Sequence, residues 1–191
     1  MAIPYYPSTS PQHTVLVPPI LGGNGKDFEE ALLKQAARMA QELTMGRYGV
    51  NGVMLPDGKG GVSWRPVSSR PDFDGSFMGG GQFNVEAKVC TGPSFPLNDD
   101  KLKEAQYAWM RNKALYGVPC YLIIHFNARE GKTFKEAAFT VSIHVHPELQ
   151  VWRDYEAGTL KSISREMAKE IGTIIPWTIP KGSRKPLPHF I

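Results

Sequence analysis

The chain has 191 residues, of which 41% are hydrophobic and 21% are charged, and its formal net charge is +4 at pH 7. This length and apolar fraction suit one folded domain and exclude a chain that is disordered throughout. No apolar run approaches the roughly 20 residues of a membrane-spanning helix, and the first residues lack the features of a secretory signal. We expect a cytoplasmic protein without membrane contact, in which Cys90 and Cys120 are reduced core thiols.

The N-terminal part of the chain divides into an arm and a helix. Residues 1–20 contain five prolines and show no periodicity, which indicates an extended arm, and residues 21–191 follow as a single domain. From Lys26 the apolar residues recur at helical spacing, and Gly46 follows as a stop signal. We therefore predict a first helix over about residues 26–45.

The middle of the chain predicts two strands that enclose a helix. Residues 83–89 alternate between apolar and polar side chains, and glycines at 79–81 mark the turn before them. The cluster at 98–100 (Asn-Asp-Asp) offers an N-cap and a negative first turn for a second helix over about residues 99–116. The apolar run at 121–124 is typical of a strand that is covered on both faces.

The C-terminal part predicts a further strand and a short helix. Residues 139–145 alternate as a strand does, and Ser162 or Ser164 can cap a last helix that ends near Gly172. These elements together predict an α/β fold with a central mixed β-sheet that the two main helices flank.

Two carboxylates and a lysine carry the chemistry that the sequence indicates. Glu86 and Lys88 are two residues apart on a predicted strand, so their side chains share one face. Asp72 precedes the glycine-rich turn, which can fold it back beside Glu86. Such oxygen ligands suit Mg²⁺, which keeps several waters and prefers sites completed by phosphates. A lysine beside them can orient or deprotonate a water for phosphodiester hydrolysis. The Glu-x-Lys spacing alone is more typical of an ordinary ion pair on a strand, and the wider sequence context decides for the site.

Several motifs in this chain resemble those of known nucleases. Pro71-Asp72 followed by Glu86-Ala87-Lys88 is similar to the signature of the PD-(D/E)xK nuclease superfamily. The wider pattern resembles the RecU-type Holliday junction resolvases in order and approximate spacing, over roughly residues 22–190. The segments that carry this resemblance are Gly25–Glu29, Asp72–Gly75, Val85–Lys88, Ser94–Leu97, Gln106, residues 121–124 and Lys161–Ser164.

This resemblance implies a restriction-endonuclease-like core and a homodimeric, Mg²⁺-dependent endonuclease, with Mn²⁺ able to substitute. It implies symmetric nicking of four-way DNA junctions during recombination and repair, with recombination proteins as partners and a place at the nucleoid. Asp72, Glu86 and Glu29 are then metal ligands, Lys88 is the catalytic lysine, and Gln106 orients the lysine, the water or the DNA. Glu29 as an exposed helix residue and Gln106 as a satisfied buried amide are the structural alternatives.

DNA contacts are expected before and after the predicted site. In the resolvases a longer projecting stalk precedes the motif aspartate and enters the junction centre, whereas here only residues 54–70 are available. Basic and aromatic residues in this stretch suit phosphate contact and stacking, although a tryptophan there is also typical of a core position. The candidates for DNA contact are Lys59, Trp64, Arg65, Arg70, Ser94 and Phe95.

Two other functions stay open at this stage. A less selective phage or mobile-element nuclease would keep the same catalytic residues but cut other DNA forms. A non-catalytic DNA-binding protein could share the fold, although the intact set of Asp72, Glu86 and Lys88 argues against it.

Overall fold

A computed structural model describes most of the chain beyond the predicted arm, of which residues 1–17 lie outside the described part. The described residues are 18–21, 25–47, 52–56, 61–66, 70–98, 100–133, 135–179 and 186–189. Within them the elements are, in order, α1 (Lys26–Arg38), β1 (Leu43–Arg47), β2 (Gly52–Pro56), β3 (Val62–Pro66), β4 (Phe73–Phe77), β5 (Gln82–Cys90), β6 (Ser94–Pro96), α2 (Glu104–Leu115), β7 (Cys120–Phe126), β8 (Arg129–Glu130), β9 (Lys135–Glu136), β10 (Phe139–His144), α3 (Gln150–Glu156), β11 (Ser162–Ser164), α4 (Arg165–Ile171), β12 (Thr173–Ile175), β13 (Trp177–Thr178) and β14 (Leu187–Pro188).

A six-stranded sheet forms the centre of the molecule, in the order β1-β4-β5-β7-β10-β12. The β5 and β7 strands run parallel, with Val85 opposite Tyr121, and the other neighbouring strands run antiparallel. The crossover between β5 and β7 carries α2, as a parallel connection requires. The prediction of a mixed α/β fold with a central mixed sheet is confirmed.

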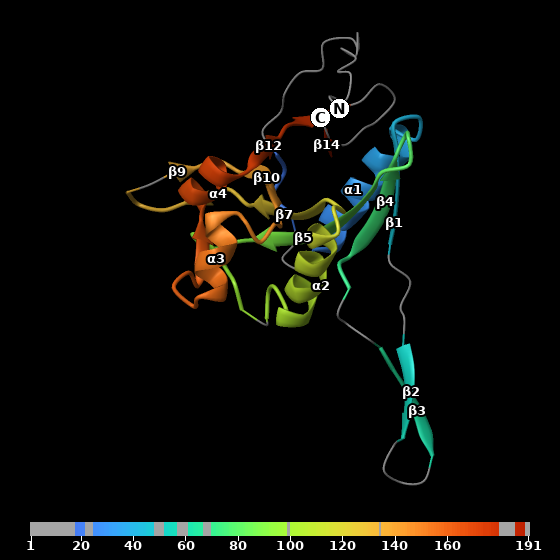
Figure 1. Cartoon of the computed structure of the whole chain (residues 1–191). Helices are drawn as coiled ribbons and strands as arrows, with labels where there is room; N and C mark the ends of the chain where they lie inside the picture. Colours follow the sequence, from blue (N-terminus) through green and yellow to red (C-terminus); the bar gives the residue numbers. More distant parts are fainter. Residues whose placement is uncertain are drawn as a thin grey trace.

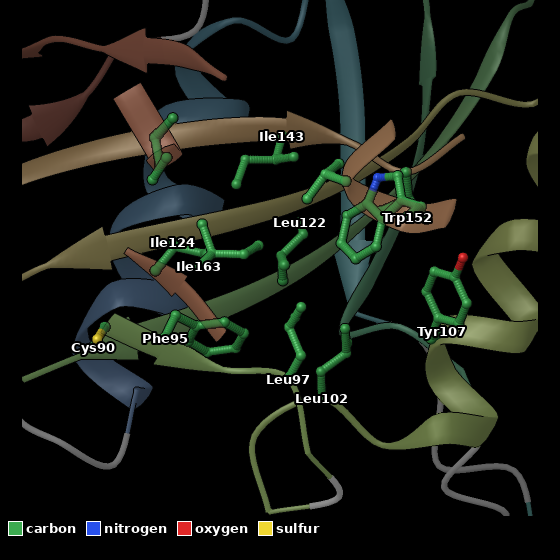
Figure 2. Close-up of a cluster of buried hydrophobic side chains, with 14 of the residues drawn as sticks. Cys90, Phe95, Leu97, Leu102, Tyr107, Leu122, Ile124, Ile143, Trp152 and Ile163 are labelled. Carbon is green, nitrogen blue, oxygen red and sulfur yellow. The ribbon is translucent and has the colours of Figure 1, made fainter. Parts of the chain in front are cut away.

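The two faces of the sheet carry separate hydrophobic clusters. On one face Phe28 and Leu32 of α1 pack against the β5 residues Val85, Ala87 and Val89. On the other face α2 and α3 cover the sheet, and Figure 2 shows their aromatic residues over the strands. The labelled side chains of this second cluster are Cys90, Phe95, Leu97, Leu102, Tyr107, Leu122, Ile124, Ile143, Trp152 and Ile163. Cys90 and Cys120 are both free and buried, as predicted.

The first helix is shorter than its periodicity predicts. The helix α1 ends at Arg38, and the Met39 carbonyl accepts hydrogen bonds from the backbone N–H of Glu42 and Leu43. Leu43 then begins β1, where it lies opposite Phe77 of β4. The prediction of helix up to residue 45 was wrong, because pairing with β4 overrides the local apolar spacing.

The second helix begins later than predicted. The Asn98 carbonyl accepts hydrogen bonds from the backbone N–H of Lys101 and Leu102, which makes a separate turn that buries Leu102. Lys103 is therefore the N-cap residue, and α2 runs only from Glu104. The turn that buries Leu102 therefore precedes α2, and the predicted acidic cluster lies before the helix and not in its first turn.

The predicted C-terminal helix is confirmed as α4, and its N-cap is Ser164, one of the two serines predicted to cap it. The Ser164 hydroxyl accepts a hydrogen bond of 3.1 Å from the backbone N–H of Met167, which satisfies one free donor of the first turn. The short helix α3 was not predicted. Val151 and Trp152 bury its inner face.

Two further features bear on function. The β2–β3 hairpin, in which Met54 lies opposite Trp64, extends away from the sheet and helices (Figure 1). It occupies the stretch where the sequence predicts DNA contacts. None of the helices in the described part of the chain has the length and apolar character to cross a membrane.

Candidate active site

The hairpin of β4 and β5 brings Asp72 next to Glu86. Phe73 pairs with Val85, so the residue before β4 lies beside the middle of β5. The chain reverses through Gly79 and Gly80, whose φ angles of 105° and 92° favour glycine. The predicted glycine turn and the predicted return of Asp72 are both confirmed.

A further glycine fixes the edge of this hairpin. A Cβ on Gly75 would lie 2.3 Å from the Thr44 carbonyl oxygen of β1 and 2.3 Å from the Phe83 ring. No larger residue fits between these strands without moving backbone. The glycine of the Asp-Phe-Asp-Gly segment is thus needed for the close packing of β1, β4 and β5.

Asp72 and Glu86 hold each other in place through the backbone. The backbone N–H of Asp72 donates a 3.0 Å hydrogen bond to Glu86 Oε2, and the backbone N–H of Ala87 donates a 2.9 Å hydrogen bond to Asp72 Oδ2. Lys88 Nζ forms an ion pair with Glu86 Oε1 and lies 4.0 Å from Asp72 Oδ2. The two carboxylates and the lysine therefore converge, as the strand spacing predicts.

Glu86 is the buried member of this group. Its side chain is fully shielded from solvent, and that burial raises its pKa to about 7 against the opposing pull of Lys88. Its Oε1 lies against the Lys88 ammonium, with which it forms an ion pair. A buried carboxylate is costly unless a cation pairs with it, and a metal ion bound at this atom would share it with Lys88.

Lys88 carries its proton at neutral pH. Burial lowers its pKa, but the nearby carboxylates of Glu86, Asp72 and Glu29 outweigh that effect, and the net pKa is raised. Of the two roles that the sequence suggested, a charged lysine suits orienting a water or a phosphate better than deprotonating a water. A divalent cation held by the same carboxylates would offset their negative charge, so they would raise the pKa of Lys88 less.

The donor set is compatible with Mg²⁺ but is not a complete cage. Among the residues that the structure describes, no three His, Cys, Asp or Glu residues are grouped so that they could hold a metal ion. Mg²⁺ commonly binds through one or two carboxylates, its own waters and substrate phosphates. Asp72 and Glu86, with Oε1 of Glu86 as a buried acceptor, fit that mode of binding.

Glu29 lies near this group but is engaged elsewhere. It stands on the first turn of α1, and its Oε2 forms an ion pair with Arg47 Nη1 of β1. Its charge still reaches the site, since it helps to raise the pKa of Lys88. The role of Glu29 as a metal ligand stays a prediction.

Gln106 supports the loop that carries Asp72. Its side chain is buried on α2, and Nε2 donates a 3.3 Å hydrogen bond to the Arg70 carbonyl, two residues before Asp72. This contact matches the satisfied buried amide that the sequence left open. Gln106 positions the aspartate loop through its backbone.

Comparison with protein-family models and with curated proteins found no match for this chain. The case for a function therefore rests on the geometry of Asp72, Glu86 and Lys88 and on the resemblance of the motifs that contain them.

The predicted DNA-contact residues differ in how the structure places them. Arg70 is exposed just before the aspartate, and Ser94 is half-buried in β6. The predicted contact of Phe95 with DNA was wrong, because its side chain is fully buried in the core and its backbone pairs with Ile163. Trp64 and Arg65 are described only as backbone positions of β3, and Lys59 lies outside the described residues.

One charged residue of this region was missed by the sequence analysis. Arg47 is half-exposed, and its guanidinium lies 5.7 Å from the centroid of the Phe73 ring. The sequence placed it just beyond a helix end and its Gly46 stop, with nothing to connect it to Phe73. Only the pairing of β1 with β4 brings it next to the site.

Proposed function

We propose that this protein is a metal-dependent DNA endonuclease with a restriction-endonuclease-like fold, and that it resolves four-way junctions as a homodimer. The observation that carries the proposal is the convergence of Asp72, Glu86 and Lys88 on one face of the β4–β5 hairpin. The resemblance of the flanking motifs supports the junction as substrate, and on the same basis we propose recombination proteins as partners and the nucleoid as location.

The residues of the site suit phosphodiester hydrolysis. A bound Mg²⁺, or Mn²⁺ in its place, would neutralise charge on the phosphate and provide hydroxide at neutral pH. Asp72 and Glu86 would hold it, with Glu86 Oε1 as the buried acceptor. The Lys88 ammonium can orient the attacking water and stabilise negative charge that develops on the phosphate oxygens. Gln106 keeps the Asp72 loop in position through the Arg70 carbonyl.

The β2–β3 hairpin is the best candidate for contact with the junction. It extends from the body of the protein (Figure 1), and Trp64 lies in its second strand. Of the predicted contacts, Lys59 and Arg65 can contact phosphates, and Trp64 can stack on an unpaired base. Cleavage and junction preference would then lie in different parts of the chain.

A cleavage assay tests this proposal. Asp72→Asn and Glu86→Gln should each abolish Mg²⁺-dependent cleavage of a mobile four-way junction while DNA binding persists, because fewer carboxylates repel the phosphates. Asp74→Asn is the matched control, since Asp74 is an exposed carboxylate two residues along β4 and should retain wild-type cleavage. Continued cleavage by either site variant would refute the assignment.

The same assay separates the alternatives. Equal cleavage of linear duplex and junction by the wild type would indicate a less selective DNA nuclease. Binding of DNA without cleavage under any divalent cation would indicate a non-catalytic DNA-binding protein.

A further inference from the structure

Arg47 stands at the point where three elements meet. It is the last residue of β1 and lies opposite Phe73, the residue that follows Asp72. Its guanidinium packs over the Phe73 ring at 5.7 Å, and its side chain is 49% exposed. A cation that is half in solvent and half held by an aromatic ring can still reach an incoming anion.

Glu29 of α1 holds this arginine. Its Oε2 pairs with Arg47 Nη1 across a sequence separation of 18 residues. Its own side chain is only 19% exposed, so solvent competes little for this pair. The pair therefore ties the end of β1, opposite the residue that follows Asp72, to the first turn of α1.

The backbone fixes Glu29 where it can hold the arginine. The backbone N–H of Glu29 donates a 3.0 Å hydrogen bond to the carbonyl of Gly25, the N-cap residue of α1. Gly25 has a φ of 74°, which favours glycine. A Cβ at this position would lie 3.8 Å from Glu29 Oε1. The helix start therefore fixes the backbone of Glu29, and the ion pair with Arg47 orients its carboxylate.

We propose that Arg47 binds a phosphate group of the DNA beside the Asp72 and Glu86 carboxylates, and that Glu29 is a positioning residue for Arg47 and not a metal ligand. This inference rests on the proposed nuclease function, because it assigns a substrate contact at the same site. A guanidinium has five N–H donors, so one side of Arg47 can stay on Glu29 while the other meets a phosphate.

DNA binding without metal gives the first test. In EDTA, log K for duplex or junction DNA should fall with log salt, and Arg47→Ala should reduce that slope by about 0.9 because one phosphate contact is lost. Arg47→Lys keeps the charge and should restore the slope. Arg153→Ala is the control, since Arg153 is an exposed arginine on α3, at the other side of the molecule in Figure 1, and should leave the slope unchanged.

Cleavage kinetics give the second test, provided that all variants melt at the wild-type temperature. Arg47→Ala should raise KM about tenfold with kcat changed less than about threefold, as expected for a contact made equally in the ground and transition states. Glu29→Gln should raise KM in the same direction without changing the Mg²⁺ concentration for half-maximal rate. The double variant should match Arg47→Ala, because both changes remove one contact.

These outcomes distinguish the inference from the proposed function. The inference would be overturned if Arg47→Ala kept the wild-type salt slope, or if Glu29→Gln needed more Mg²⁺. The proposed nuclease function would still stand if the wild type cleaved DNA. An Arg47-dependent salt slope in a protein that never cleaves DNA would support the phosphate contact and refute the nuclease.

Discussion

His125 is buried as a neutral ring, so acid should destabilise the folded chain through this residue. Its Nε2 lies 3.0 Å from the Pro19 carbonyl oxygen and its Nδ1 lies 2.8 Å from Thr140 Oγ1. A carbonyl only accepts, so Nε2 carries the hydrogen and Nδ1 accepts from the hydroxyl. Trp177 Nε1 donates to the same hydroxyl at 2.7 Å. The neutral ring therefore satisfies every polar partner around it.

Burial lowers the pKa of His125 from 6.5 to about 4, even though its hydrogen bond to Pro19 acts in the opposite direction. Between these two values the unfolded chain binds the proton that the folded chain refuses, so stability is complete above about pH 6.5 and is lost as the pH falls. One pKa unit corresponds to about 1.4 kcal/mol. The His125 contribution should therefore fall by about 2 kcal/mol between about pH 7 and pH 5.

Urea unfolding of the wild type and His125→Gln at these two pH values measures this contribution. Glu86 has a raised pKa and contributes a pH dependence of opposite sign, but it is present in both proteins and cancels when they are compared. The substitution should cost about 2 kcal/mol more at about pH 7 than at about pH 5. If its cost is the same at both pH values, His125 is not the buried neutral group described above.

Other predictions concern assembly, DNA contact and the core. Symmetric incision of a two-fold junction requires two related active sites, so light scattering should show a dimer, and a monomer at micromolar concentration with and without junction DNA would contradict it. Trp64→Ala should weaken junction binding by roughly 1 to 3 kcal/mol and leave duplex binding unchanged, whereas equal losses would show that Trp64 is not a junction contact. Arg65→Ala or Lys59→Ala should each flatten the salt dependence of binding by about 0.9, and an unchanged slope would exclude that contact. Phe95→Ala should lower the free energy of unfolding by about 3 to 5 kcal/mol, and a loss below about 1 kcal/mol would contradict its burial.

Sequence periodicity predicted the arrangement on β5 because a strand alternates strictly. Side chains two residues apart on a strand share one face, so Glu86 and Lys88 had to lie together. The glycine turn was enough to return Asp72 to them. The strand β7 was recognisable from the apolar run at 121–124, because a strand that is covered on both faces has apolar side chains on both.

Features that depend on distant partners could not be predicted. The end of α1 was misplaced because the pairing of Leu43 with Phe77 decides it. Arg47 had no signal, since its neighbours Glu29 and Phe73 are 18 and 26 residues away along the chain. Phe95 was placed at the DNA because a motif position says nothing about whether its side chain points into the core.

The attachment of residues 18–21 has a consequence for the order of folding. The Asn127 side chain bonds both the N–H and the carbonyl of Leu21, at 2.8 Å and 2.9 Å, across a sequence separation of 106 residues. Synthesis at about 5 to 20 residues per second leaves this segment waiting about 5 to 20 seconds for its partner. The part of the described chain that is made first can thus dock only after β7 and Asn127 have been made.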